Sequence, residues 1–221
     1  MTKELKAVIF DLDGVIADTA KFHYQAWKKL ASGIGINLTY EFNERLKGIS
    51  RMESLDLILT LTGNDYSNEE KIELANKKNR YYLEFVSRMT PSDLLPGVVK
   101  CFEVIKDNNI KIVLASASKN SLDVIKRLKV EKYFDYVVDS KDILKSKPNP
   151  EIFIKSAKGI KVATRNCVGV EDSIAGILAI NACNMFSVGI GNKKNLYPAN
   201  ICLKNLTEFD IKKICLIGGF L

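Results

Sequence analysis

Short apolar runs of strand length alternate with helical patterns along most of the chain. These runs occupy residues 7–10, 111–115, 136–138, 166–170 and 185–190. Between them, segments such as 98–106 and 122–128 carry apolar residues at helical spacing. Strands that are apolar throughout are buried on both faces, which is typical of parallel sheets covered by helices. The pattern therefore predicts an α/β fold built on a doubly wound, Rossmann-like parallel sheet.

A helical insertion interrupts this alternation after the first strand. From about residue 18 to 91 the sequence shows helical periodicity and no strand-like apolar run. The first helix is expected to stop near Gly33 and Gly35, since glycine commonly ends helices. Its apolar face would hold Ala20, Tyr24, Trp27 and Ala31. We therefore expect a small helical cap domain over residues 18–91 and an α/β core made of residues 1–17 and 92–221.

The chain after residue 192 is the least clearly patterned part. Its apolar residues are compatible with a last strand over 201–203 and a closing helix over 206–217. At 221 residues the chain has room for one large domain with a smaller insertion and a full hydrophobic core.

Composition and charge place the chain among soluble globular proteins and limit its partners. Apolar residues make up 47% and charged residues 27% of the sequence. The net charge of +7 comes from scattered lysines, with no basic stretch interleaved with aromatic residues, so nucleic acid is not expected as a partner. No apolar stretch reaches the ~20 residues that span a membrane, and the 5 cysteines form no CxxC pair, so neither disulfides nor zinc are implied. The expected location is a reducing cytoplasm.

Two aspartates follow the first apolar run directly, in the segment DLDGV at 11–15. A carboxylate that attacks phosphorus forms an acyl phosphate and divides one difficult displacement into two easier ones, and Asp11 is placed for this role. Asp13 can protonate the leaving oxygen and later deprotonate the acceptor. An EF-hand loop also begins D-x-D, but its glycine at position six and its glutamate at position twelve are replaced by Ile16 and Phe22. The motif therefore predicts phosphoryl transfer through an aspartyl phosphate.

On these residues the sequence resembles the haloacid dehalogenase superfamily of phosphotransferases, whose first motif is D-x-D-x-[TV]. The later motifs of that superfamily have matches in the same order: Ser116 at a strand end, Lys147 in SKPNP, and the acidic pair Glu171 and Asp172 after another strand. The resemblance implies a parallel sheet of the haloacid dehalogenase type. It also implies that the Ser116 hydroxyl cradles the transferring phosphate. Lys147 would hold the nucleophile Asp11 and the phosphate together.

A magnesium ion is the cofactor that the resemblance implies. Mg²⁺ prefers one or two carboxylates together with waters and substrate oxygens. The implied metal ligands are Asp11, Asp13 through its backbone carbonyl, Glu171 and Asp172.

The insertion resembles the helical cap of superfamily members that act on small phosphorylated molecules. Among these members, the chain most resembles the enzymes that move a phosphate between two positions of a sugar. Four segments carry this resemblance, which spans essentially the whole chain: residues 18–27, 46–51, 78–79 and 115–120. Such a reaction needs a second anion site away from the metal. Arg51 can grip a phosphate bidentately, and the loop after Ser116 adds a hydroxyl, a cation and an amide. The substrate-binding residues implied are Trp27, Lys47, Gly48, Arg51, Ser54, Lys78, Ala117, Ser118, Lys119 and Asn120.

Thr19, His23 and Trp27 are spaced to lie on one face of the first cap helix. The resemblance gives Thr19 and His23 catalytic roles and implies that His23 lies near the hinge and hydrogen-bonds Asp13. For Trp27, packing inside the cap and contact with a sugar are both open, because aromatic faces serve both purposes.

The reaction implied by the resemblance interconverts β-D-glucose 1-phosphate and glucose 6-phosphate through glucose 1,6-bisphosphate. A small phosphorylated sugar is the expected partner, with no nucleic acid and no membrane. A monomer is expected, because a lid that opens and closes needs no second subunit. The alternative is a sugar-phosphate phosphatase of the same superfamily, in which water replaces the second sugar hydroxyl. Glu171, where many phosphatases carry Gly or Ala, favours the mutase together with Arg51 and Lys119. A non-catalytic protein on this scaffold would lack the nucleophile or the acid/base residue, and both are present.

Overall fold

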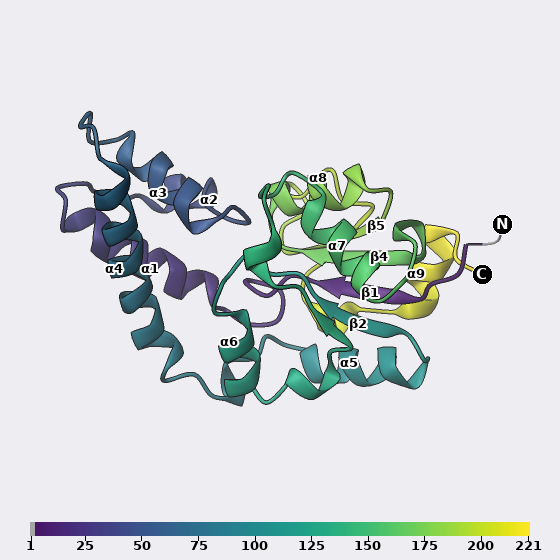
Figure 1. The fold of residues 1–221 in the computed structure, drawn as a ribbon. Helices are drawn as coiled ribbons and strands as arrows, with labels where there is room; N and C mark the ends of the chain where they lie inside the picture. The colour runs from purple at the N-terminus through teal and green to yellow at the C-terminus, as the bar shows by residue number, and fades with distance from the viewer. Residues whose placement is uncertain (1–2) are drawn as a thin grey trace.

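The computed structural model describes residues 3–221 and shows a helical body beyond the carboxyl ends of the strands of an α/β core (Figure 1). The core sheet has six strands in the order β3-β2-β1-β4-β5-β6, and all neighbouring pairs are parallel. The strands are β1 (Ala7–Phe10), β2 (Lys111–Leu114), β3 (Tyr136–Val137), β4 (Cys167–Glu171), β5 (Phe186–Ile190) and β6 (Ile201–Leu203). The predicted doubly wound parallel sheet is confirmed. The strand order reverses beside β1, and ligands bind at the carboxyl ends of the strands at such a switch point.

Nine α-helices lie within residues 3–221, four of them in the helical body and five around the sheet. The body contains α1 (Ala20–Ser32), α2 (Tyr40–Glu44), α3 (Arg51–Leu59) and α4 (Asn68–Val86). The core contains α5 (Val98–Asp107), α6 (Ser121–Arg127), α7 (Glu151–Gly159), α8 (Ile174–Ala182) and α9 (Ile211–Gly218). Short 3₁₀ turns occupy η1 (Pro91–Asp93), η2 (Glu131–Tyr133), η3 (Ser140–Asp142), η4 (Thr164–Asn166) and η5 (Leu206–Glu208). Within residues 3–221, no helix is both long and apolar enough to cross a membrane.

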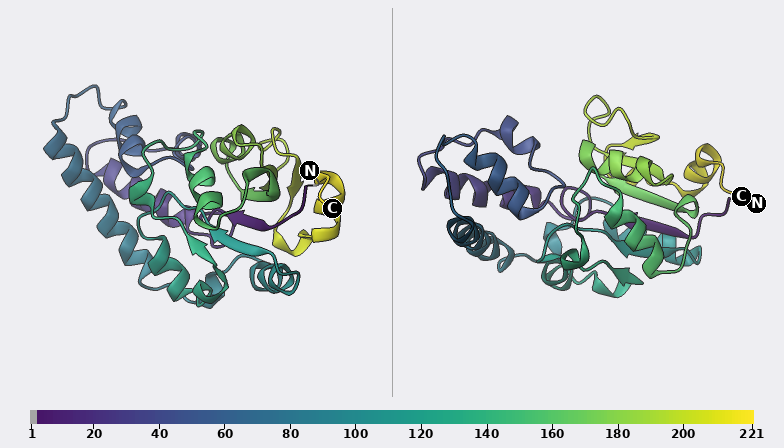
Figure 2. Two further views of the ribbon diagram at one scale, coloured as in Figure 1. Left: turned by 45° about the vertical axis from the view of Figure 1, so that its right-hand side comes forward. Right: turned by 45° about the horizontal axis from the view of Figure 1, so that its top comes forward.

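Strand β1 is buried on both faces because helices cover each side of the sheet (Figure 2). Val8 and Phe10 pack into the cluster that also holds residues of α5, α6 and α9. Ala7 and Ile9 pack into the cluster formed with α7 and α8. All four side chains are fully buried, which explains why the run is continuously apolar instead of alternating.

The helical body has a hydrophobic cluster of its own. Helices α3 and α4 each begin with a capping box, in which a serine side chain and a glutamate side chain satisfy backbone amides reciprocally. On α1, Trp27 and Ala31 are buried as expected, whereas Tyr24 is only half-buried and Leu30 joins the buried face instead. The helix ends at Ser32, with glycine as its C-cap, as the sequence predicts.

Two chain crossings join the helical body to the core, and they run side by side. Ala17 forms an antiparallel bridge with Leu94, and the Leu95 amide donates to the Ile16 carbonyl at 2.9 Å. The domain limits expected at residues 18 and 91 lie close to this paired crossing and stay a prediction.

The closing segment differs in part from the prediction. Strand β6 lies where it was expected, but the helix predicted over 206–217 is divided into the turn η5 and the helix α9. The division falls before Asp210, whose side chain caps α9 by accepting from the Lys213 amide at 3.1 Å. An aspartate at this position favours a new helix start over continuation.

Candidate active site

A buried lysine lies between two carboxylates at the carboxyl ends of β1 and β4. Lys147 Nζ donates to Asp11 Oδ1 at 2.6 Å and to Glu171 Oε1 at 2.5 Å. The exposed fractions are 6% for Asp11, 2% for Lys147 and 1% for Glu171. Burial raises the pKa of Asp11 well above its usual range, although Lys147 opposes the shift. The carboxylates in turn outweigh burial and raise the pKa of Lys147, so the lysine stays charged.

The loop after β1 positions both aspartates of the motif. Asp11 Oδ2 accepts the backbone amide of Asp13 at 2.9 Å, which orients the nucleophile candidate within the turn. Gly14 has a φ of +81°, and a Cβ there would overlap the carboxylate of Asp172. Glycine is therefore required both by its backbone conformation and by the close approach of an acidic side chain. Ser116 is buried just beyond β2, the neighbouring strand, where its hydroxyl accepts the Ser118 amide at 3.1 Å.

The acidic residues at this edge fit a divalent cation. Burial and the neighbouring Glu171 raise the pKa of Asp172 to about 7, and Glu171 and Asp13 act in the same direction on Asp11. An added cation would relieve this crowding of negative charge. Within residues 3–221, however, no three acidic, histidine or cysteine side chains are already arranged to hold a metal.

Glu171 is the implied metal ligand with the most other contacts. Its Oε1 accepts from Lys147, and its Oε2 accepts from the Ser173 amide and hydroxyl, each at 2.8 Å. The carboxylate of Asp172 is freer, with Lys47 Nζ 3.5 Å from Oδ2. The Asp172 carboxylate is therefore more available to a metal than that of Glu171, and the roles of Asp11, Asp13, Glu171 and Asp172 as metal ligands stay predictions.

Asp13 is surrounded by residues from the helical body. The Thr19 hydroxyl donates to Asp13 Oδ1, and His23 Nε2 lies 3.6 Å from the same oxygen without a hydrogen bond. Burial raises the pKa of Asp13, whereas Thr19 lowers it. The structure thus brings His23 beside Asp13 as implied, and Thr19 is the residue that makes the hydrogen bond.

Lys78 on α4 is buried against aromatic rings beside Asp13. Its Nζ lies 2.8 Å from His23 Nδ1, 4.7 Å from the centre of the Trp27 ring and 5.1 Å from that of Tyr82. Burial and the nearby Arg51 lower the pKa of Lys78 to about 7. Burial and Lys78 lower the pKa of His23 well below its usual range, so the imidazole is neutral. A lysine and a histidine with displaced pKa values beside a candidate acid/base group are typical of a functional site.

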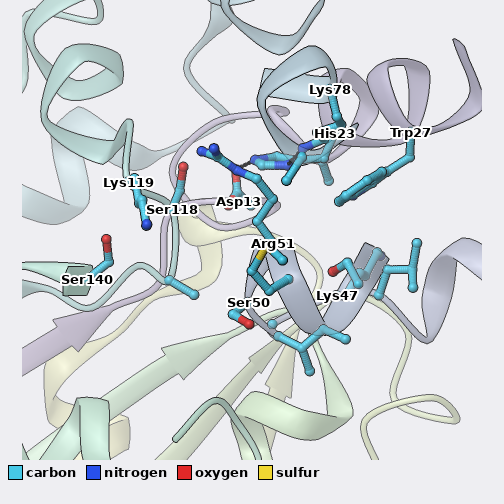
Figure 3. Close-up of a pocket in the computed structure, with 18 of the residues that line it drawn as sticks. Asp13, His23, Trp27, Lys47, Ser50, Arg51, Lys78, Ser118, Lys119 and Ser140 are labelled. Atoms are coloured by element: carbon cyan, nitrogen blue, oxygen red, sulfur yellow. Dashed lines mark hydrogen bonds and ion pairs between the residues drawn. The ribbon is translucent and has the colours of Figure 1, made fainter. Parts of the chain in front are cut away.

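Arg51 and Asn120 form a further group of donors, which converge on Asn79. Arg51, the first residue of α3, donates from Nη2 to Asn79 Oδ1 at 2.9 Å. Asn120, which precedes α6 in the core, donates from its side-chain amide to the same oxygen at 2.9 Å. Arg51 carries positive charge into the cavity there, close to Ser118 and Lys119 (Figure 3).

One cavity of about 690 Å³ connects these two groups, between the helical body and the core (Figure 3). The predicted site residues that line it are Asp11, Asp13, His23, Trp27, Lys47, Gly48, Arg51, Ser54, Lys78, Ala117, Ser118, Lys119, Glu171 and Asp172. Four others are buried behind its wall: Thr19, Ser116, Asn120 and Lys147. Trp27 packs in the cluster of the helical body and also lines the cavity, so its packing role is confirmed and its contact with a sugar stays a prediction.

Sequence reasoning missed several residues of this site. Asn79 belongs to a segment that carries the family resemblance but was given no role of its own, although it joins Arg51 to Asn120. Tyr82, whose ring centre lies 4.1 Å from that of His23, follows Lys78 by four residues on α4, and this helical spacing could have found it. Ser140 on η3 also lines the cavity, and no sequence signal pointed to that loop.

A parallel α/β sheet with a carboxylate nucleophile candidate at its switch point, beneath an inserted helical body, defines the capped phosphoryl-transfer enzymes. The haloacid dehalogenase-like hydrolase family model matches residues 5–184, and the chain belongs to that family. The assignment agrees with the resemblance in the sequence motifs.

Individual relatives are more informative about the subgroup. The chain is 43% identical over 210 residues to a protein of Bacillus subtilis named beta-phosphoglucomutase, covering 94% of this chain and 93% of the relative. A crystal structure of beta-phosphoglucomutase from Clostridium difficile superposes with a TM-score of 0.94 at 48% identity, covering 97% of each chain. A protein of Thermotoga maritima named phosphorylated carbohydrates phosphatase is 31% identical, with 82% of each chain covered.

Proposed function

We propose that this chain is a β-phosphoglucomutase that interconverts β-D-glucose 1-phosphate and glucose 6-phosphate. The observation that carries the proposal is that one cavity is lined both by the two aspartates Asp11 and Asp13 and by the cations Arg51 and Lys119. A sugar bisphosphate presents two phosphates to one enzyme, so both groups would be used. The high identity to the two β-phosphoglucomutases supports the same function.

In the proposed reaction, phosphorylated Asp11 transfers its phosphate to the C6 hydroxyl of glucose 1-phosphate. Asp13 accepts the proton of that hydroxyl while the new P–O bond forms and the acyl phosphate bond breaks. The product, glucose 1,6-bisphosphate, then reverses its orientation in the cavity. Asp11 attacks the C1 phosphate, and Asp13 returns the proton to the departing C1 oxygen, which leaves glucose 6-phosphate and the phosphorylated enzyme.

The remaining core residues hold the phosphate and balance charge. Lys147 keeps Asp11 oriented through its 2.6 Å contact and supplies positive charge to the transferring group. Ser116 would offer its hydroxyl from the neighbouring strand end. Asp11, the Asp13 backbone carbonyl and Asp172 would hold Mg²⁺, which, when bound, neutralises charge on the phosphate oxygens.

The helical body, residues 18–91, would act as a lid on the cavity. Such a lid excludes water and contributes specificity. Lys47, Gly48 and Ser54 line the cavity from the helical body and would contact the sugar. A lid that opens and closes on the paired crossing at Ala17 and Leu94 requires no second subunit, so a monomer is expected.

The deciding experiment incubates the protein with β-D-glucose 1-phosphate, Mg²⁺ and a trace of glucose 1,6-bisphosphate. Glucose 6-phosphate and free phosphate are followed together. We expect isomerisation with little phosphate release. Phosphate release without isomerisation would support the sugar-phosphate phosphatase instead and sink the mutase proposal.

Arg51→Ala should abolish most mutase turnover while leaving small substrates unaffected. We expect kcat/KM for β-D-glucose 1-phosphate to fall by about 10²–10³-fold, because a charge-assisted contact to the non-reacting phosphate is lost. The phosphorylation of the enzyme by acetyl phosphate, which has no second phosphate, should change less than about twofold. Arg80→Ala, at an exposed position of α4, is the matched control. Equal loss with both substrates would mean that Arg51 serves the structure or the reacting phosphate.

Thr19→Val should shift the pH profile of the mutase. The variant removes the hydroxyl that stabilises the Asp13 carboxylate, so the pKa of Asp13 should rise further. Because Asp13 must be deprotonated to act as a base, the acidic limb of the kcat profile should move to higher pH. Thr19→Ser keeps the hydroxyl and should restore the original limb. An unchanged profile in Thr19→Val would show that this hydrogen bond does not tune Asp13.

A further inference from the structure

Asn79 on α4 joins the helical body to the core through a single oxygen. Its Oδ1 accepts from Arg51 Nη2 at 2.9 Å and from Asn120 Nδ2 at 2.9 Å. Arg51 belongs to the helical body, whereas Asn120 is a buried residue of the core. One carboxamide oxygen therefore accepts two donors that the fold supplies from opposite sides of the cleft.

Two donors that converge on one oxygen form the arrangement that a phosphate oxygen needs. Phosphate is bound by convergent N–H groups, and a guanidinium contributes the strongest of these contacts. A long arginine side chain loses considerable rotamer freedom when it is ordered for binding. Asn79 keeps Arg51 ordered before any phosphate arrives.

The charge of the acceptor matters as much as its position. Arg51 forms no ion pair among residues 3–221, and Lys78 and Lys119 line the same cavity. An amide oxygen orients the guanidinium without cancelling its charge. An aspartate in its place would form an ion pair with Arg51 and compete with an incoming anion.

We propose that Asn79 is a positioning residue for the non-reacting phosphate, holding Arg51 and Asn120 in place at the wall of the cavity until the phosphate takes over both donors. The proposal rests on the proposed mutase function for its substrate. In this proposal a neutral residue of α4 orders the second anion site before the phosphate binds.

The first test measures the binding of glucose 6-phosphate by calorimetry. Mg²⁺ and beryllium fluoride occupy Asp11 as a mimic of its acyl phosphate, so that the phosphate of the sugar is directed to Arg51 instead. We expect Asn79→Ala to raise Kd about tenfold and Asn79→Asp about 100-fold, the second because its carboxylate neutralises Arg51. The control Asn64→Ala lies in an exposed turn of the helical body and should bind normally.

The second test separates positioning from a general effect on structure. In Asn79→Ala, the KM for β-D-glucose 1-phosphate should rise about tenfold with kcat changed less than about twofold, and phosphorylation by acetyl phosphate should be unchanged. In the Arg51→Ala background, adding Asn79→Ala should cost less than about twofold more, because the residue to be positioned is already gone.

Several results would overturn the inference. Equal losses with both substrates would make Asn79 structural, and a lower KM in Asn79→Ala would make its oxygen a competitor of the phosphate. Unchanged binding in both Asn79 variants would remove any role at this site. If the unaltered protein fails to isomerise β-D-glucose 1-phosphate, the mutase proposal fails, and the binding measurement still decides the role of Asn79.

Discussion

Asp11→Asn is expected to lower mutase turnover by about 10⁴-fold or more, because an amide cannot form the acyl phosphate on which both transfers depend. The variant should still fold. Asn can accept the Asp13 amide as Asp11 Oδ2 does, and Lys147 retains its 2.5 Å contact with Glu171. The substitution removes a buried carboxyl whose pKa burial raises, which favours the fold, and one of the two carboxylate partners of Lys147, which disfavours it, so the net change in stability should be small.

Two measurements check this expectation. Isomerisation is followed with β-D-glucose 1-phosphate, and the phosphorylated enzyme is sought by intact mass after incubation with acetyl phosphate. The added mass of one phosphate should be absent in Asp11→Asn. Asp56→Asn is the matched control, since Asp56 is exposed and paired with Lys71 on the helical body. A phosphorylated Asp11→Asn protein would place the nucleophile elsewhere.

Lys147→Met should have the largest effect on stability as well as on activity. It leaves Asp11 and Glu171 buried without their shared cation, and removal of one partner from a buried ion pair costs about 3–5 kcal/mol. Loss of the charge that faces the transferring phosphate should reduce kcat about 10³-fold. Lys71→Met is the control, because Lys71 pairs with Asp56 at the surface of the helical body. Its free energy of unfolding should fall by at most about 1 kcal/mol.

The stability deficit of Lys147→Met should depend on pH with a defined sign. A carboxyl whose folded-state pKa lies above the ~3.9 of the unfolded chain destabilises the fold fully above that folded pKa. The penalty shrinks as the pH falls below the folded pKa and is gone near the pKa of the unfolded chain. The pKa of Asp11 is already raised and should rise further without Lys147. In the unaltered protein the raised pKa of Lys147 keeps the lysine charged from pH 5 to 8, so its charge opposes the rise in the pKa of Asp11 throughout that range.

Urea unfolding at pH 5 and pH 8, without divalent metal, measures this dependence. The difference in free energy of unfolding between Lys147→Met and the unaltered protein should be smaller at pH 5. A deficit that is the same at both pH values would mean that lost packing around Lys147, and not the uncompensated carboxylates, is responsible.

The sheet could be predicted from the sequence because its signal is local. Strands buried on both faces read as short apolar runs, and each of the five runs became a strand of the parallel sheet. The closing segment was harder, since η5 and α9 share an apolar pattern and only the cap at Asp210 separates them. Helical periodicity likewise placed α1 but not its whole buried face, which depends on the packing of α1 against α4.

The residues of the candidate site also fall into two groups, those that the sequence could predict and those that it could not. Asp11, Asp13, Lys147 and Asp172 were found because they follow strands or stand in short motifs, and parallel strands bring such ends to one edge of the sheet. The sequence by itself determined these residue types, their order and the presence of a helical insertion. Only the tertiary structure decided that Asn79 bridges the helical body to the core. Contacts of this kind depend on how two separately packed bodies meet, and no local pattern in the chain encodes that meeting.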